Sequence, residues 1–145
     1  MKDSANMTTG TGDRQHEYLE QIRRFLSQQD GLAAAWLYGS RARGEYRDDS
    51  DIDIAVALNN FEKTYSERRL LPEIMAQDLT AQLGHPVQVV DISLAPIPLA
   101  INILEDGHPV LIKDELRYCR ETNRIYGLWN DHCWHKAETH KEKQA

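Results

Sequence analysis

The sequence lacks both a long hydrophobic run and an excess of positive charge. No stretch of its 145 residues approaches the ~18 consecutive apolar residues of a transmembrane helix, so we expect none. Lys and Arg number 17 against 23 Asp and Glu, which gives a net charge of −6. Because polynucleotides and anionic membranes attract basic patches, this charge argues against direct binding to nucleic acid or to a membrane.

Cysteine is also scarce. The two cysteines, Cys119 and Cys133, lie in a segment that we predict to be helical, where their separation corresponds to roughly 21 Å. That distance is too long for a disulfide between them, so we expect a protein of the reducing cytoplasm. Residues 1–15 are polar and carry no apolar segment of the kind that a secretory signal requires.

Apolar periodicity predicts an alternation of helices and strands. A period near 3.6 indicates helices and a period of 2, or a short apolar run, indicates strands. The expected helices are 15–28, 64–83, 96–104 and 114–134, and the expected strands are 32–38, 51–58, 87–92 and 110–112. Pro72 either lies in the first turn of a helix that begins late or kinks a longer one.

This order predicts an α/β (α+β) domain with a small mixed β-sheet flanked by helices. We expect the domain to cover residues 15–135, between a disordered lead-in over 1–14 and a polar tail over 136–145. Residues 39–50 are polar and rich in turn formers, which predicts a loop with at most one helical turn.

One group of residues predicts a site for an anion and a metal ion: Gly39-Ser40, a ten-residue spacer, and Asp51-Ile52-Asp53. A glycine directly after a buried strand lets backbone N–H groups approach an anion, and the Ser40 hydroxyl adds a donor. Asp51 and Asp53 alternate on one strand and so point to the same side, where two carboxylates suit Mg²⁺. The simpler alternative is an ordinary strand exit followed by two solvated acids.

These residues carry a resemblance to a known family. The segments 39–44 (GSRARG) and 50–54 (SDIDI) resemble the minimal nucleotidyltransferases of the DNA polymerase β superfamily. More closely, the chain is similar to the antitoxins of the HEPN/MNT toxin–antitoxin systems. The resemblance implies the nucleotidyltransferase fold, with Asp51 and Asp53 as catalytic metal ligands and Gly39 and Ser40 at the phosphates of the nucleotide.

The superfamily uses a third acid on a later strand, and Asp91 at the end of residues 87–91 is the expected one. In that role Asp91 would complete the metal site and take the proton of the acceptor hydroxyl. The alternative is that Asp91 caps the following turn together with Ser93. Arg41 and Arg43 are expected to contact phosphate, unless they belong to a solvated loop.

The activity implied by the resemblance is transfer of AMP from ATP, with two Mg²⁺ ions per site. In the antitoxin branch the acceptor is a tyrosine of a HEPN ribonuclease toxin, which would be the protein partner of this chain. Two alternatives stay open: a stand-alone nucleotidyltransferase that modifies a small-molecule hydroxyl, and a non-catalytic antitoxin that acts by occlusion. A homo-oligomer also stays open.

Two features near the C-terminus lie outside this group of residues. The residues His132, Cys133, His135 and His140 are too irregular in spacing to predict a zinc site. An aromatic helix face that includes Tyr126, Trp129 and Trp134 is either part of the core or a docking surface for the toxin or a second copy.

Overall fold

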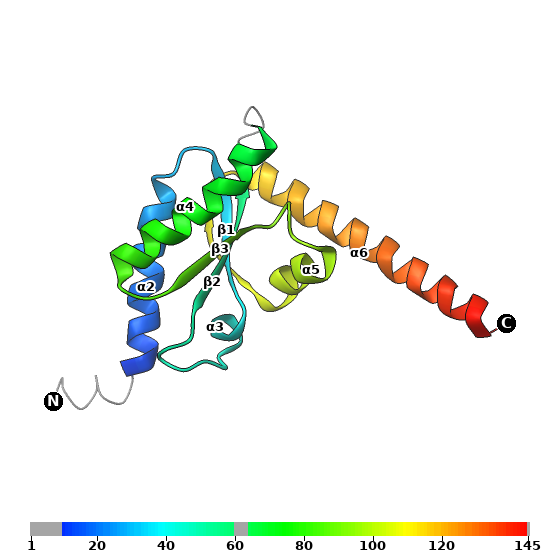
Figure 1. Ribbon diagram of the computed structural model, residues 1–145, viewed down its shortest axis with the longest axis horizontal. Coiled ribbons are helices and arrows are strands. Elements are labelled where there is room, and N and C mark those ends of the chain that lie inside the picture. The colour runs from blue at the N-terminus through cyan, green and yellow to red at the C-terminus, as the bar shows by residue number, and fades with distance from the viewer. Residues whose placement is uncertain (1–9, 60–63, 145) are drawn as a thin grey trace.

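The fold is a four-stranded mixed sheet with helices on both faces. The structure is a computed structural model that describes residues 10–59 and 64–144 (Figure 1). Its strands are β1 (Leu32–Tyr38), β2 (Ile52–Leu58), β3 (Val87–Asp91) and β4 (His108–Ile112), in the spatial order β3-β2-β1-β4. β1 is antiparallel to β2 and β4, and β2 is parallel to β3. The predicted α+β class with a small mixed sheet is confirmed.

The helices divide between the two faces of the sheet (Figure 1). They are α2 (Gly10–Ser27), α3 (Ser40–Arg43), α4 (Tyr65–Leu83), α5 (Ile97–Asp106) and α6 (Glu115–Gln144). α2 and α4 cover one face, where Ile22, Leu26 and Leu79 meet one side of β2. α5 and α6 cover the other face, where Ile103 and Ile125 pack against Trp36. None of the described helices is both long enough and apolar enough to span a membrane.

Two helices are longer than expected. α2 begins at Gly10, before the expected start at 15, and α6 continues to Gln144, through most of the expected polar tail. Apolar periodicity marks only the part of a helix that packs, whereas the Lys, Glu, Gln and Ala residues at the end of α6 also favour helix in solvent. The first residues of α2, Gly-Thr-Gly-Asp, have no such preference, and nothing in the sequence explains their helical conformation. The rest of the expected lead-in, residues 1–9, lies outside the described part of the chain.

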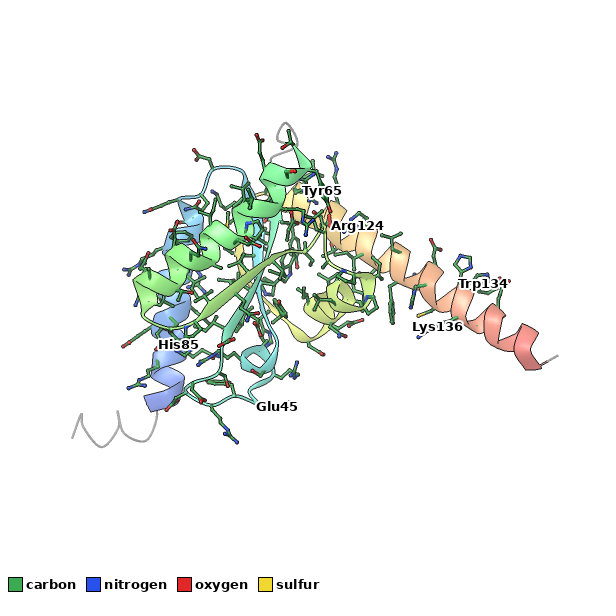
Figure 2. All side chains as sticks on the ribbon, viewed as in Figure 1. Glu45, Tyr65, His85, Arg124, Trp134 and Lys136 are labelled. Atoms are coloured by element: carbon green, nitrogen blue, oxygen red, sulfur yellow. The ribbon has the colours of Figure 1, made fainter. Side chains whose placement is uncertain are left out.

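The C-terminal half of α6 extends away from the sheet, and Trp134 lies on this projecting part (Figure 2). Trp134 is 65% exposed, whereas Trp129 packs at the edge of the core. The aromatic face is therefore core at one end and solvent-exposed at the other. Cys119 and Cys133 are both free and exposed on this helix, as their spacing predicts.

Pro72 lies inside α4, well beyond the first turn of a helix that begins at Tyr65, so the alternative of a helix that begins late is wrong. The helix begins at a capping box, in which Thr64 accepts from the backbone of Glu67 and the Glu67 side chain accepts from the backbone of Thr64. It ends at Gly84 in the left-handed conformation. These two ends set the length of the connection that brings β3 alongside β2.

Glu121 is a buried carboxylate that forms ion pairs with two arginines of the same helix, α6. Glu121 is 2% exposed and accepts hydrogen bonds from Arg117 Nη1 (2.7 Å) and Arg124 Nε (2.9 Å). Arg117 also donates to the Leu58 carbonyl at the end of β2 (3.3 Å). Burial raises the pKa of Glu121, but the hydrogen bonds from Arg124 and Arg117 outweigh it, and the pKa lies below its ordinary value.

We therefore predict that Glu121→Gln lowers the free energy of unfolding by about 2 kcal/mol at pH 7, because two guanidinium groups lose their counter-charge. A carboxyl with a lowered pKa in the folded state stabilises above its unfolded pKa, and this contribution is lost as the pH falls through the folded pKa. The difference between variant and parent should therefore shrink in acid. Urea denaturation at pH 7 and pH 4 measures it, with the exposed Glu138→Gln as control; an equal loss at both pH values would contradict the prediction.

Candidate active site

The turn after β1 brings backbone unusually close to a carboxylate. Gly39 has φ 74° and ψ −157°, a conformation that L side chains rarely adopt. A Cβ at Gly39 would stand 2.4 Å from Asp53 Oδ2, which is closer than any real contact of that kind. The one-turn helix α3 follows directly, with the amides of Ala42 and Arg43 donating to the Gly39 carbonyl (3.1 and 3.2 Å). The backbone conformation and the facing carboxylate thus both favour glycine at this position.

Asp51 and Asp53 come from the start of β2 and lie on the same side of the strand. Asp51 is exposed, whereas Asp53 is half-buried and pairs in register with Tyr38 on β1. Burial raises the pKa of Asp53, the charge of Asp51 raises it further, and Arg43 acts in the opposite direction. Burial and the charge of Asp53 together raise the pKa of Tyr38 to about 12. The structure thus brings Gly39 and both predicted carboxylates together.

Gln88 on β3 is a neighbour of the two acids that the sequence pattern does not identify. It pairs in register with Asp53, and its Nε2 donates to Asp51 Oδ2 (3.2 Å). Alternation along β3 identifies Gln88 as a residue that faces away from the α4 side, but it does not say which residue of β2 lies beside it. That information comes only from the register of the parallel pair.

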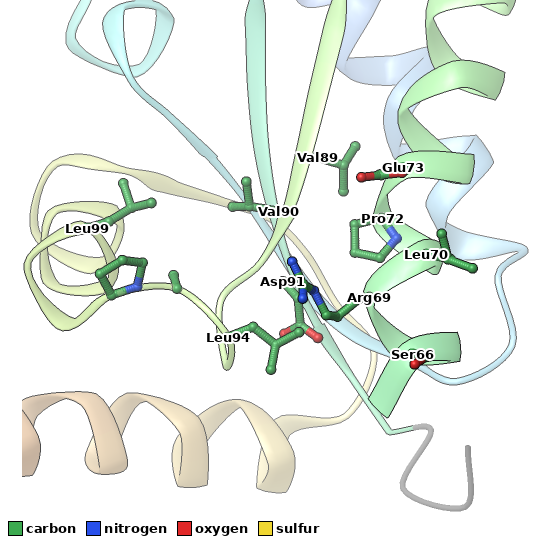
Figure 3. Close-up of a pocket in the computed structure, with 12 residues that line it drawn as sticks. Ser66, Arg69, Leu70, Pro72, Glu73, Val89, Val90, Asp91, Leu94 and Leu99 are labelled. Carbon is green, nitrogen blue, oxygen red and sulfur yellow. The ribbon is translucent and has the colours of Figure 1, made fainter. Parts of the chain in front are cut away.

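Asp91, in contrast, is not brought to the acid pair. It pairs with Val56, three positions further along β2 than Asp53, and an odd separation from Gln88 places it on the opposite face of β3. Its Oδ1 accepts from the backbone and the hydroxyl of Ser93 (2.9 and 2.6 Å), which is the capping alternative. The carboxyl is buried beside a cavity of about 580 Å³ between α4 and α5 (Figure 3). The expectation that Asp91 completes the metal site is therefore corrected.

Arg41 also has a different place from the one expected. It is buried, and its guanidinium donates to three carbonyls of the next loop, those of Arg47, Asp48 and Ser50 (3.3, 3.1 and 3.0 Å). A further bond reaches Gln15 Oε1 on α2 (3.2 Å). These bonds occupy the donors that a phosphate would need, so Arg41 holds the loop that leads into Asp51.

Arg43 stays accessible. Its side chain is exposed, and Nε lies 3.4 Å from Glu45 Oε2 in a surface ion pair. Its positive charge acts to lower the pKa of Asp53, against the larger effects of burial and Asp51. Contact between Arg43 and phosphate remains a prediction, as does the role of the half-buried Ser40.

A known family matches two thirds of the chain. Over residues 20–116 the chain matches the family model described as Polymerase beta, Nucleotidyltransferase. The chain belongs to this family. The matched region contains the Gly39 turn, both carboxylates of β2 and Gln88, so the predicted superfamily is confirmed.

Solved structures of this nucleotidyltransferase fold are similar over most of the chain. A chain from a toxin–antitoxin crystal structure with AMP-PNP shares 19% identity and a TM-score of 0.65, over 89% of this chain and 98% of that one. A chain from the complex of tri-AMPylated Shewanella oneidensis HEPN toxin with MNT antitoxin has the same identity and TM-score, over 90% and 99%. At this identity the likeness establishes the fold. The comparison with curated proteins gives no match.

The Gly39 contact makes a specific prediction about stability. Gly39→Ala should cost about 1–2 kcal/mol more than Gly44→Ala, because Gly44 is in the left-handed conformation, whereas Gly39 has a backbone conformation that is essentially restricted to glycine and also faces a carboxylate. A Cβ at Gly44 would meet no atom within 4 Å, so Gly44→Ala measures the cost of the left-handed backbone alone. In a double-mutant cycle, Asp53→Ala should remove the part of the difference that comes from the carboxylate. Equal losses at the two glycines would contradict this account.

The buried position of Arg41 makes a second prediction. Arg41→Lys should lower the free energy of unfolding by about 2–3 kcal/mol, because an ammonium cannot reach the three loop carbonyls and Gln15 together. Hydrogen exchange should show faster opening at Ser50, whose amide bonds the Arg47 carbonyl. The matched control, Arg43→Lys, should stay within about 0.5 kcal/mol of the parent. The prediction fails if the two lysine variants are equally stable.

Proposed function

We propose that the chain is an adenylyltransferase antitoxin, which transfers AMP from ATP to a tyrosine of a HEPN ribonuclease toxin. The observation that carries the catalytic part is the meeting of the Gly39 turn with the carboxylates of Asp51 and Asp53. A half-buried backbone turn for phosphate and two carboxylates for a cation thus lie side by side. The family to which the chain belongs performs nucleotidyl transfer, which agrees with this arrangement.

The residues of the turn would bind the nucleotide. Backbone N–H groups at Gly39 and the Ser40 hydroxyl would hold phosphate oxygens, and the exposed guanidinium of Arg43 would pair with the triphosphate. The donor set fits a divalent cation, because two carboxylates repel each other at the start of one strand and the pKa of Asp53 is raised by burial and by Asp51. Asp51 and Asp53 would hold Mg²⁺, which would neutralise the charge of the triphosphate.

The reaction is a displacement at the α-phosphorus. The tyrosine oxygen forms a bond to this phosphorus, the bond to the bridging oxygen of the β-phosphate breaks, and pyrophosphate leaves with both electrons of that bond. The hydroxyl proton is released. The turn and the acid pair act by positioning the reacting groups and balancing charge, which is the main source of rate in such transfers.

The toxin as acceptor is supported by the similar structures. They come from toxin–antitoxin complexes, one with an ATP analogue and one with a HEPN toxin that carries AMP groups. On a ribonuclease, an added AMP places bulk and negative charge where an RNA phosphate has to bind. Inactivation would then outlast the contact between the two proteins.

Mass spectrometry of the cognate HEPN toxin, after incubation with this protein, ATP and Mg²⁺, tests the proposal. We expect a mass increase of AMP on a tyrosine. Asp51→Asn and Asp53→Asn should each slow the transfer by about 100-fold or more, because each removes a charge that faces the transferred group. Asp91→Asn is the matched control, since Asp91 lies on the other face of β3, and it should keep the activity.

Three outcomes would contradict the proposal. If the toxin is neutralised without any adduct, the chain acts by occlusion. If AMP appears on a small hydroxyl compound and never on the toxin, the acceptor class is wrong. If Asp53→Asn leaves the transfer unchanged, the assignment of the site is wrong.

A further inference from the structure

Gln88 is a third polar side chain, which lies beside the two acids Asp51 and Asp53 and is neutral. It lies beside Asp53 in the sheet and donates to Asp51 Oδ2 across 3.2 Å. Among residues 10–59 and 64–144, no group of three or more His, Cys, Asp or Glu side chains gathers as a metal site. In the described part of the chain, the negative charge of the cation site therefore comes from Asp51 and Asp53.

An amide at this place has two effects on a cation. It contributes no charge, so the attraction between the site and a divalent ion is weaker than with a carboxylate at the same position. Its N–H also donates to Asp51 Oδ2, which reduces the negative charge that this oxygen offers to a metal ion. Both effects lower the affinity of the nucleotide-free site.

A packing role does not account for this side chain. Gln88 is exposed, it lies on the edge strand β3, and its two neighbours Val87 and Val89 supply the core contacts on the other face. The hydrogen bond to Asp51 is thus the main contact of the amide. An exposed amide whose hydrogen bond goes to one of the two acids is expected to act on that pair.

We propose that Gln88 is a positioning residue that sets the cation affinity of Asp51 and Asp53. The nucleotide-free protein binds a single divalent cation, weakly, and further cations enter together with the triphosphate. The inference rests on the proposed function, since it concerns the same two carboxylates. It adds that loading of the site depends on the nucleotide, and that one side chain on β3 determines this dependence.

Titration of the full chain with Mn²⁺, without nucleotide, tests the inference by isothermal calorimetry and by electron paramagnetic resonance of the free ion. Mn²⁺ prefers the same carboxylate ligands as Mg²⁺ and can be counted directly. We expect one equivalent for the parent protein and ~10-fold tighter binding for Gln88→Glu. That factor is what one added unit charge about 5 Å from a divalent ion supplies in water.

The control variants distinguish tighter Mn²⁺ binding caused by a charge at position 88 from the effect of a negative charge added elsewhere on the protein. Gln82→Glu adds the same group on an exposed part of α4 and should leave the affinity unchanged. Asp53→Asn should abolish the binding, and thermal melts should show that each variant folds. Two equivalents in the parent protein, or an unchanged affinity in Gln88→Glu, would overturn the inference.

The Mn²⁺ titration uses this chain alone, so its result can be judged separately from the transfer of AMP to the toxin. If Gln88→Glu tightens Mn²⁺ binding but no AMP reaches the toxin, the cation site stands and the acceptor is wrong. If AMP transfer needs Asp53 and Gln88→Glu binds Mn²⁺ like the parent, the proposed function stands and the role of Gln88 is wrong.

Discussion

The antiparallel register of β1 and β2 is the constraint on which the candidate site depends. It places Tyr38 opposite Asp53, so the chain leaves β1 at the point where the carboxylates of β2 begin. Gly39 then passes so close to Asp53 that a Cβ at position 39 would stand 2.4 Å from Asp53 Oδ2. A slip of one residue would turn Asp53 to the opposite face of the sheet and remove it from the turn. Side-chain size opposes such a slip, because β2 places the large Ile52, Ile54 and Val56 on one face and the small Ala55 and Ala57 on the other.

This register alone does not hold the connection between the strands. Residues 44–51 form an irregular segment that would be free to move if only its ends were fixed. The buried guanidinium of Arg41 binds three carbonyls of this segment and links it to α2 through Gln15. A planar group with five donors suits this task, since it satisfies several backbone acceptors from one position. The acids are thereby presented on a fixed support, although Asp51 itself is exposed.

Local patterns predicted the strands, the Gly39 turn and the two acids, because each depends on residues close together in the sequence. Asp91 and Gln88 could not be assigned in this way. Which residue of β3 lies beside Asp53 depends on the length of α4 and on its two ends, and periodicity within β3 does not contain that information. Arg41 was misassigned for a related reason. A guanidinium close to a turn that is predicted to bind phosphate suggests a ligand contact, and only the tertiary structure shows that its donors already bond the protein.

The exposure of the site bears on the kind of acceptor. Small-molecule sites bury most of their ligand in an enclosed cavity, which supplies the contacts that orient it. Here Asp51, Gln88 and Arg43 are all exposed, and the cavity of about 580 Å³ lies beside Asp91, on the other face of β3 from Gln88. If the site holds the triphosphate as proposed, the exposure of Asp51, Gln88 and Arg43 leaves few walls to orient a free hydroxyl compound. An acceptor carried by a folded protein brings its own orienting surface, so the open geometry favours a protein tyrosine over a small molecule.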